Sequence, residues 1–79
     1  VFIVHGGLPR NPDFMVKDID TIQRGTFVPE GDTLLSDILW SDPRPAKGYD
    51  SSPRGGGVFF GPDVTEDFLK RNNLKLIIR

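Results

Sequence analysis

Apolar residues along the chain gather into short runs that are separated by stretches rich in glycine and proline. Residues 1–4 are all apolar and are followed by His-Gly-Gly, which predicts a short buried strand. A strand that is apolar on both faces is typical of a central position in layered α/β arrangements, with cover on both sides. Residues 8–13 contain two prolines and are predicted to form a loop.

A first short helix is predicted after this loop, from residue 14 to residue 22. Val16, Ile19 and Ile22 recur at every third position, which places them on one face of a helix. Gly25 then lies just past its end, where helices commonly stop. The stretch from this glycine to residue 32 contains a proline and a second glycine and is predicted to be a connector.

A second helix is predicted over residues 33–40, where the apolar side chains form a wide stripe. The stripe occupies positions i, i+1, i+4 and i+5 and consists of Leu34, Leu35, Ile38 and Leu39. The side chain of Asp32 or of Thr33 can cap the N-terminus of this helix. Pro43 stops it, because the residue before a proline is pushed out of the helical region.

The second half of the chain is predicted to contain a loop, a strand, a helix and a last strand. Residues 43–56 are dense in Gly, Pro and Ser and are expected to be a loop, whereas residues 58–60 are expected to be a strand. The clearest helix follows, with Asp63 as its N-cap and Glu66 completing a pair that resembles a capping box. Its apolar face consists of Val64, Phe68 and Leu69.

Two adjacent asparagines are expected to end this helix, and residues 74–78 are expected to form a strand. The predicted order of elements is therefore β-α-α-β-α-β, with loops of irregular length. This mixture of helices and strands places the chain in the α+β class.

Composition limits this chain to one small domain or to a part of one. It has 79 residues, of which 37% are hydrophobic, and so short a chain buries only a modest share of its unfolded surface. It contains no Cys and one His, which excludes a disulfide or a cysteine-based zinc site as the staple that small domains use. The composition thus indicates a piece of a larger fold.

Charge and hydropathy exclude several classes of function. Ten Lys and Arg against eleven Asp and Glu give a net charge of −1, without the clustered basic residues on which nucleic-acid binding relies. No apolar run approaches the roughly 18 residues of a membrane span. The apolar N-terminus is too short and lacks the basic flank of a signal peptide. The lack of Cys makes a cytoplasmic or nuclear location the default expectation.

Three polar residues stand where chemistry is commonly found. His5 follows the first predicted strand, and a neutral imidazole there is a natural metal ligand, or else a turn residue that hydrogen-bonds a carbonyl. Arg54 precedes three glycines and can offer parallel N–H donors to a phosphoryl group, or else it is a solvated loop residue. Asp42 lies on a proline-stiffened turn, where it can orient a substrate group or hold Arg54. Alternatively, this turn only ends the helix, with Trp40 in the core.

Four short motifs run through the chain in a fixed order. They are HGGL at residues 5–8, LWSDP at 39–43, RG at 54–55 and FG at 60–61. In this order and spacing they resemble the C-terminal half of the catalytic domain in the phosphoprotein phosphatase (PPP) family of metal-dependent Ser/Thr phosphatases. Asp18-Ile19 and Arg24 also fit the short helix after the HGG motif. Within that family, the segments RGGGVFFGPDVT and NNLKLIIR most resemble the subgroup of protein phosphatase five and the EF-hand-containing phosphatases.

The resemblance implies a fold and a mechanism. The fold would be part of a metallophosphoesterase-like β-sandwich flanked by helices. The activity would be hydrolysis of phosphoserine and phosphothreonine by a water that two divalent metal ions, of the Mn, Fe or Zn type, activate. By the same resemblance, His5 is a metal ligand, Arg54 binds the phosphoryl oxygens and Asp42 lines the substrate cleft. The implied partners are phosphoprotein substrates and the remainder of the catalytic domain.

The chain lacks segments on which the chemistry of that family depends. The GDxHG, GDxxDRG and GNHE motifs, which lie upstream of HGG in the family, do not occur. The second downstream metal histidine of the family follows the strand that ends here at residue 79. A hydrolytic metal site needs about three protein ligands, so one imidazole cannot hold the ion with useful affinity.

The sequence leaves three interpretations of the chain open. The first is that residues 1–79 are a fragment of a Ser/Thr phosphatase catalytic domain and are inactive on their own. The alternative is a non-catalytic, phosphatase-like module for interaction or regulation. In the third interpretation the motifs reflect only a common scaffold.

Overall fold

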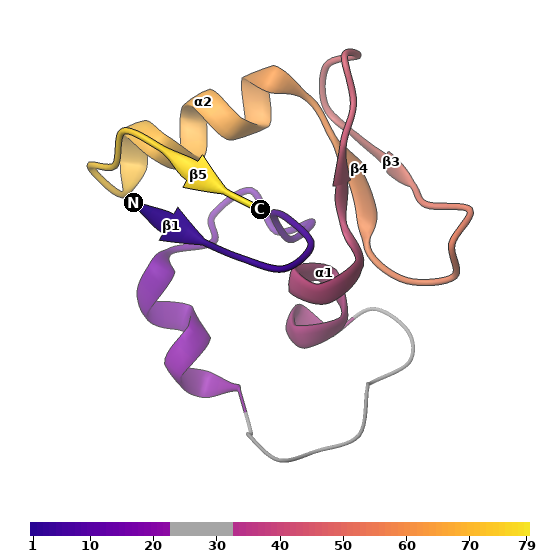
Figure 1. Cartoon of the computed structure of the whole chain (residues 1–79), viewed down its shortest axis with the longest axis horizontal. Coiled ribbons are helices and arrows are strands. Elements are labelled where there is room, and N and C mark those ends of the chain that lie inside the picture. Colours follow the sequence, from indigo (N-terminus) through magenta and orange to yellow (C-terminus); the bar gives the residue numbers. More distant parts are fainter. Residues whose placement is uncertain (23–32) are drawn as a thin grey trace.

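The computed structural model describes residues 1–22 and 33–79, which form two small sheets connected by helices (Figure 1). The elements in chain order are β1 (Phe2–Ile3), η1 (Val16–Thr21), α1 (Leu34–Trp40), β2 (Asp42–Pro43), β3 (Tyr49–Ser51), β4 (Val58–Phe60), α2 (Pro62–Arg71) and β5 (Ile77–Ile78). This mixture confirms the predicted α+β class. Some residues that the sequence analysis used lie outside the described ranges: Arg24, Gly25 and Asp32.

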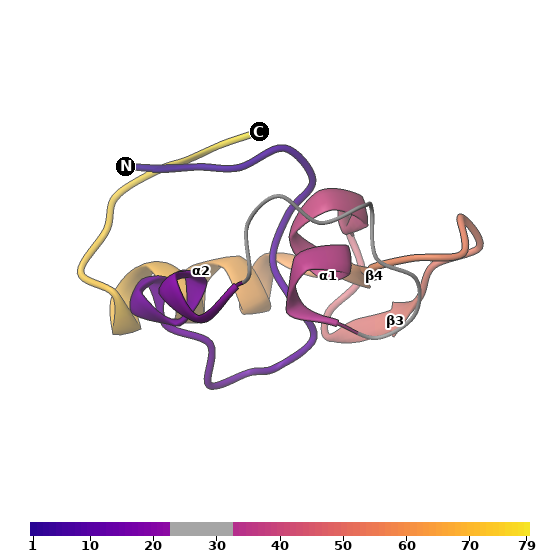
Figure 2. The same cartoon turned by 90° about the horizontal axis from the view of Figure 1, so that it is seen from below.

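Strands β1 and β5 form a two-stranded parallel sheet that joins the two ends of the chain. The amide of Val4 donates a hydrogen bond to the carbonyl of Ile78 at 2.9 Å. Strand β5 is shorter than the strand predicted over residues 74–78. Phe2 and Val4 face the core, whereas Ile3 is 71% exposed. The prediction that this strand is covered on both faces is therefore wrong for the described residues, because the helices lie on one side of it (Figure 2).

The core forms where β1, the loop after it and α2 meet. Its buried side chains are Phe2, Val4, Leu8, Phe14, Phe60 and Phe68. The ring centroid of Phe68 lies 5.2 Å from that of Phe2 and 5.7 Å from that of Phe14. Aromatic side chains each bury a large area, so these three rings supply much of the contact between α2 and the start of the chain.

The predicted first helix is a 3-10 helix of six residues, η1. Its sequence, VKDIDT, is rich in Asp and β-branched residues, which are weak α-helix formers. Ile19 packs against the core as predicted. Val16 does not, since it is 38% exposed, and the buried Phe14 just before the helix anchors the segment instead.

Helix α1 forms where the sequence predicts a helix, and Thr33 is its N-cap. The amide of Ser36 donates to the Thr33 Oγ1 at 3.1 Å. Within the predicted apolar stripe, Leu34 and Ile38 pack against the core. The residues of α1 with the lowest exposure are nevertheless polar, namely Ser36 and Asp37, each 1% exposed.

The buried carboxylate of Asp37 accepts three hydrogen bonds from Arg10. The Arg10 backbone N and Nε lie 2.9 Å from Oδ2, and Nη2 lies 2.7 Å from Oδ1. Burying a carboxylate is costly unless charged donors pair with it, and a guanidinium fork satisfies both oxygens at once. This pair ties the loop after β1 to α1, and the sequence analysis did not identify it.

A three-stranded sheet in the order β2-β4-β3 occupies much of the segment that was predicted to be a loop. Strand β2 is parallel to β4 and β3 is antiparallel to it, and β4 coincides with the predicted strand. The prediction of a loop over residues 43–56 is thus wrong in part. The two added strands have two and three residues, which is too short for an alternating pattern to show, and Pro43 suits the edge position of β2.

Helix α2 begins earlier than predicted, with Gly61 as N-cap and Pro62 as its first residue. Proline is favoured there because the first turn of a helix needs no N–H donor from it. The predicted N-cap, Asp63, instead accepts a hydrogen bond from the Gly48 amide at 2.9 Å. Asn72 ends the helix as predicted. None of the helices in the described ranges has the length and hydropathy that a membrane span requires.

Candidate functional site

His5 lies at the carboxyl end of β1, where two glycines turn the chain over α1. The amides of Gly6 and Gly7 both donate to the Ile38 carbonyl, at 2.9 and 3.2 Å. A Cβ on Gly6 would lie 2.5 Å from the carbonyl carbon of Leu39, so a larger residue has no room there. The two glycines therefore bring His5 beside the last turn of α1.

Arg54 reaches the same place from the loop between β3 and β4. Its Cζ lies 5.0 Å from the centroid of the Trp40 ring. Its Nη1 donates to the two carboxylate oxygens of Asp42, at 3.1 and 3.3 Å. A cation–π contact and an ion pair together orient this side chain, although it is 48% exposed.

His5 and Arg54 line one shallow depression of about 160 Å³, together with Leu39 and Trp40. The structure thus brings an imidazole from the end of β1 and a guanidinium from the loop before β4 to the same place. Asp42 adjoins them through its ion pair with Arg54. Of the roles that the sequence left open for Asp42, the structure shows the one in which it holds Arg54.

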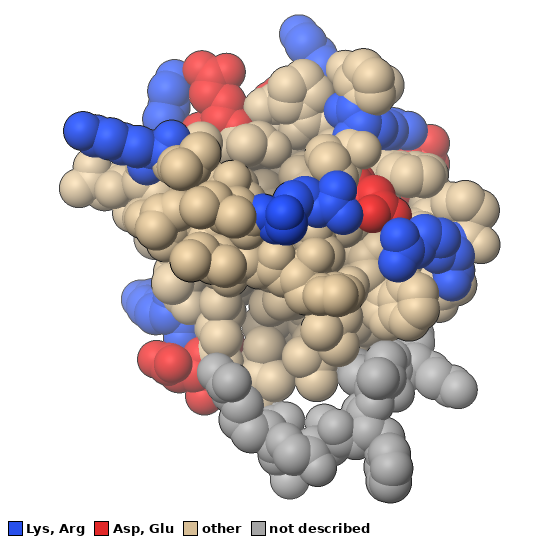
Figure 3. Space-filling model, viewed as in Figure 1, with Lys and Arg blue, Asp and Glu red and all other residues tan. Residues whose placement is uncertain are grey.

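Arg79 belongs to the same cluster, and the sequence analysis did not identify it. Its Nε donates to the Gly6 carbonyl at 2.6 Å, and its Nη2 donates to Oδ1 of Asp42 at 3.0 Å. On the face shown in Figure 3, basic side chains adjoin an acidic one near the end of β5. One signal could have identified Arg79. It directly follows a strand, and the carboxyl ends of paired parallel strands meet at one edge of a sheet.

The charges of this cluster favour an anion. The guanidiniums of Arg54 and Arg79 share one carboxylate, that of Asp42, which leaves an excess of positive charge. Each guanidinium has five N–H donors, and the contacts with Asp42 and Gly6 use only some of them. The two side chains are 48% and 41% exposed, so an oxyanion can approach them. Planar guanidiniums match the oxygens of a phosphate group.

The described residues do not by themselves fit a divalent metal ion. Across residues 1–22 and 33–79, no three His, Cys, Asp or Glu side chains lie together in a way that could hold one. A hydrolytic metal site needs about three protein ligands. The carboxylate of Asp42 already accepts hydrogen bonds from two guanidiniums, so it is not available as a metal ligand. The imidazole of His5 is exposed and can contribute one ligand to a site that other residues complete.

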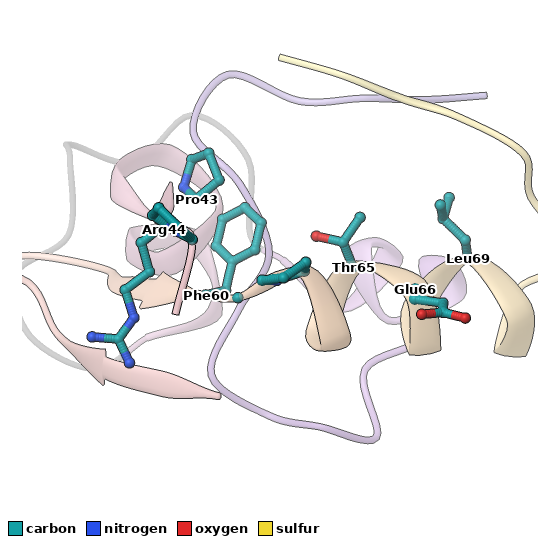
Figure 4. Close-up of a pocket in the computed structure, with 9 residues that line it drawn as sticks. Pro43, Arg44, Phe60, Thr65, Glu66 and Leu69 are labelled. Atoms are coloured by element: carbon teal, nitrogen blue, oxygen red, sulfur yellow. The ribbon is translucent and has the colours of Figure 1, made fainter. Parts of the chain in front are cut away.

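A larger hollow of about 440 Å³ lies between β4, β2 and α2 (Figure 4). Thr65, Glu66 and Leu69 line it along α2, and Pro43 and Phe60 line its other side. Its walls are mainly prolines and aliphatic or aromatic carbon, without an imidazole, and its charged residues Arg44 and Glu66 pair with Asp50 and Lys70. The smaller depression, which holds both His5 and Arg54, is therefore the candidate site.

Comparison with known proteins identifies relatives along the whole chain. Residues 1–79 match the family model described as calcineurin-like phosphoesterase. The chain is 47% identical to serine/threonine-protein phosphatase 5 of Solanum lycopersicum, over 100% of this chain and 14% of that protein. It is 46% identical to serine/threonine-protein phosphatase 5 of Homo sapiens, over 100% of this chain and 16% of that protein.

A solved structure is similar as well. It is a protein serine/threonine phosphatase from Saccharomyces cerevisiae with similarity to human phosphatase PP5. It matches with a TM-score of 0.83 and 40% identity, over 95% of this chain and 23% of that chain. The chain therefore spans a small part of the length of its relatives. These matches confirm the predicted resemblance to protein phosphatase five and the predicted type of fold. The chain belongs to the calcineurin-like phosphoesterase family.

Proposed function

We propose that residues 1–79 are part of the catalytic domain of a protein serine/threonine phosphatase that hydrolyses phosphoserine and phosphothreonine. The observation that carries this proposal is that His5 and Arg54 line one depression. The names of relatives that are 46% and 47% identical over the whole chain support it further.

Arg54 is the residue that we propose for binding the phosphoryl oxygens of the substrate. Its guanidinium is already oriented by Trp40 and Asp42, so little conformational freedom is lost when an anion binds. Negative charge on the phosphoryl oxygens is balanced by such a donor during the reaction, which accelerates the chemical step. Asp42 adjoins this depression through its ion pair with Arg54, and we propose that it borders the substrate cleft and keeps Arg54 in place.

His5 is the residue that we propose as a ligand of a metal ion. The calcineurin-like phosphoesterase family is metal-dependent. Two divalent ions of the Mn, Fe or Zn type would supply a water that is nucleophilic at neutral pH. His5 offers one imidazole, and residues 1–22 and 33–79 supply no group of three ligands, so we expect this stretch to be inactive without the rest of the catalytic domain.

The remainder of the catalytic domain is the partner that we propose for the outer face of the β1–β5 sheet. Four apolar side chains are exposed at β1 and β5, namely Val1 (64%), Ile3 (71%), Leu76 (52%) and Ile78 (47%). Parallel sheets in proteins are almost always covered on both faces. An exposed apolar face next to a parallel sheet therefore supports a covering layer from the rest of a larger domain.

The test is hydrolysis of p-nitrophenyl phosphate in the presence of Mn²⁺ by the full-length protein that contains this chain. We expect Arg54→Ala to lower kcat/KM about 10²–10³-fold, because a preorganised donor to the phosphoryl oxygens is lost. The matched control is Arg44→Ala, since Arg44 also pairs with an aspartate, Asp50, at 2.9 Å but does not line the depression. We expect this control to leave kcat/KM unchanged.

Two results would contradict the proposal. The first is full-length protein that binds Mn²⁺ and hydrolyses no phosphate ester, which would favour the non-catalytic, phosphatase-like interaction or regulatory module. The second is an Arg54→Ala variant that is as active as the Arg44→Ala control.

A further inference from the structure

Arg79 connects three parts of the candidate site that lie far apart in the sequence. Its Nε holds the Gly6 carbonyl at 2.6 Å, one residue after His5. Its Nη2 holds Oδ1 of Asp42 at 3.0 Å. Through that carboxylate it is linked to Arg54, whose Nη1 lies 3.1 Å from Oδ2.

The shared carboxylate changes what Arg54 can do. When one guanidinium pairs with one carboxylate, their charges cancel, and the pair attracts an anion only weakly. Here Asp42 divides its negative charge between two guanidiniums, so Arg54 keeps positive charge for another anion. The bond from Arg79 also fixes one oxygen of the carboxylate, which limits how far Asp42 can turn toward Arg54.

We propose that Arg79 is a positioning residue for Arg54, which it orients and keeps electrostatically available through Asp42. This inference rests on the proposed function, in which Arg54 binds the phosphoryl group. The fork of Arg79 spans two acceptors, the Gly6 carbonyl and the Asp42 carboxylate. A lysine at this position keeps the charge but has one ammonium group for two separate acceptors.

The experiment measures the Kd of inorganic phosphate by calorimetry on the full-length protein, with kcat and KM for p-nitrophenyl phosphate measured in parallel. We expect Arg79→Gln to raise the Kd about tenfold, as is typical for the loss of a charge-assisted hydrogen bond. We expect Arg79→Lys to raise it less. In an Arg54→Ala background, we expect Arg79→Gln to have no further effect, because Arg79 acts through Arg54.

The matched control is Arg44→Gln. Arg44 also spans a carboxylate and a carbonyl, because it donates to Asp50 at 2.9 Å and to the Lys47 carbonyl at 3.4 Å. We expect this variant to keep the wild-type Kd for phosphate.

The inference is overturned if Arg79→Gln leaves the Kd unchanged. It is also overturned if Arg79→Gln raises the Kd equally in the wild-type and Arg54→Ala backgrounds, which would mark a merely structural role. If Arg79→Gln does not fold, Arg79→Lys in the two backgrounds decides by the same comparison. A protein in which Arg79→Gln weakens phosphate binding only when Arg54 is present, but which hydrolyses no phosphate ester, would refute the proposed function and leave this inference standing.

Discussion

At the residue scale, two glycines next to candidate site residues serve different physical purposes. Gly6 follows His5, and a Cβ there would lie 2.6 Å from the Ile38 carbonyl oxygen, so glycine is needed for space. Gly55 follows Arg54, and a Cβ there would have no atom within 4 Å, so space is not the reason for glycine. Its φ is +84°, so glycine is needed for the backbone conformation. The two residues therefore allow a comparison of steric and conformational cost.

We expect Gly6→Ala to destabilise the full-length protein by about 1–3 kcal/mol, because the added carbon forces β1 and α1 apart. Gly55→Ala should cost about 1 kcal/mol, which is the usual cost of a left-handed conformation for a residue with a side chain. Chemical denaturation of both variants measures the two losses of stability and shows which is larger. A larger loss for Gly55→Ala than for Gly6→Ala would contradict the assigned role of the close approach.

The sequence predicted three of the residues that meet at the candidate site, and it missed one. His5, Arg54 and Asp42 stand out because each directly precedes a glycine or a proline in a predicted turn or loop. Arg79 directly follows a predicted strand, but the local pattern does not reveal that this strand lies beside β1, which is what brings Arg79 to the site. The pair of Arg10 and Asp37 was missed for the same reason, because contacts between distant residues leave no local signal.

At the element scale, the start of α2 shows how a tertiary contact overrides a local capping pattern. The sequence Gly-Pro-Asp allows either Gly61 or Asp63 to be the N-cap. The structure selects Gly61, and the Asp63 carboxylate is directed to the Gly48 amide of the preceding loop. Glu66 does not complete a capping box with Asp63, and it pairs with Lys70 one turn later at 3.3 Å.

We expect Asp63→Asn to make the stability of the full-length protein less sensitive to acid. The hydrogen bond from the Gly48 amide holds the pKa of Asp63 below its ordinary value. A lowered pKa in the folded state stabilises the protein at pH values above the ordinary pKa of Asp. This contribution is lost as the pH falls through the folded pKa. Asp63→Asn should therefore lower Tm at neutral pH, and the difference from wild type should shrink towards about pH 3.

The control for this titration is Glu66→Gln on the same helix. Glu66 and Lys70 are 70% and 76% exposed, so their ion pair contributes little. We expect its Tm to stay near wild type throughout. A constant difference between Asp63→Asn and wild type from neutral pH to about pH 3 would refute the role of the Gly48 contact.

The two α-helices and the apolar strands β1, β4 and β5 could be predicted from the sequence, whereas the polar strands β2 and β3 could not. Helices α1 and α2 carry apolar faces over seven and ten residues, which is enough for a periodic pattern to appear. Strands β2 and β3 are shorter, and they exist because the intervening strand β4 pairs with both. The 3-10 form of η1 was also not predicted, although it has a local contact, a hydrogen bond from the Met15 amide to the carboxylate of Asp18.

At the scale of the whole molecule, the sheet of β1 and β5 separates two environments. Phe2 on its inner face is 6% exposed and packs on Phe14 and Phe68, whereas Ile3 on its outer face is 71% exposed. The proposed catalytic domain requires the outer face to be covered by residues other than those that the structure describes.

We expect Ile3→Asp to destabilise the full-length protein strongly, by at least about 2 kcal/mol, because a covered apolar side chain is replaced by a charge. Val16→Asp is the control, since Val16 is an exposed apolar residue of η1, and it should cost far less. Denaturant unfolding measures both. Equal and small losses would show that the outer face stays in contact with water in the full-length protein.

The parallel pairing of β1 with β5 has a consequence for the order of folding. Phe2 is paired with Ile77, and Arg79 closes on Gly6 across 73 positions, so almost the whole chain forms one loop. Contacts of such long sequence separation are slow to form, because the entropy of closing the loop has to be overcome first. During synthesis Arg79 must leave the ribosome before it can align Asp42 and Arg54, so we expect the proposed anion site to form only after β5 has been made.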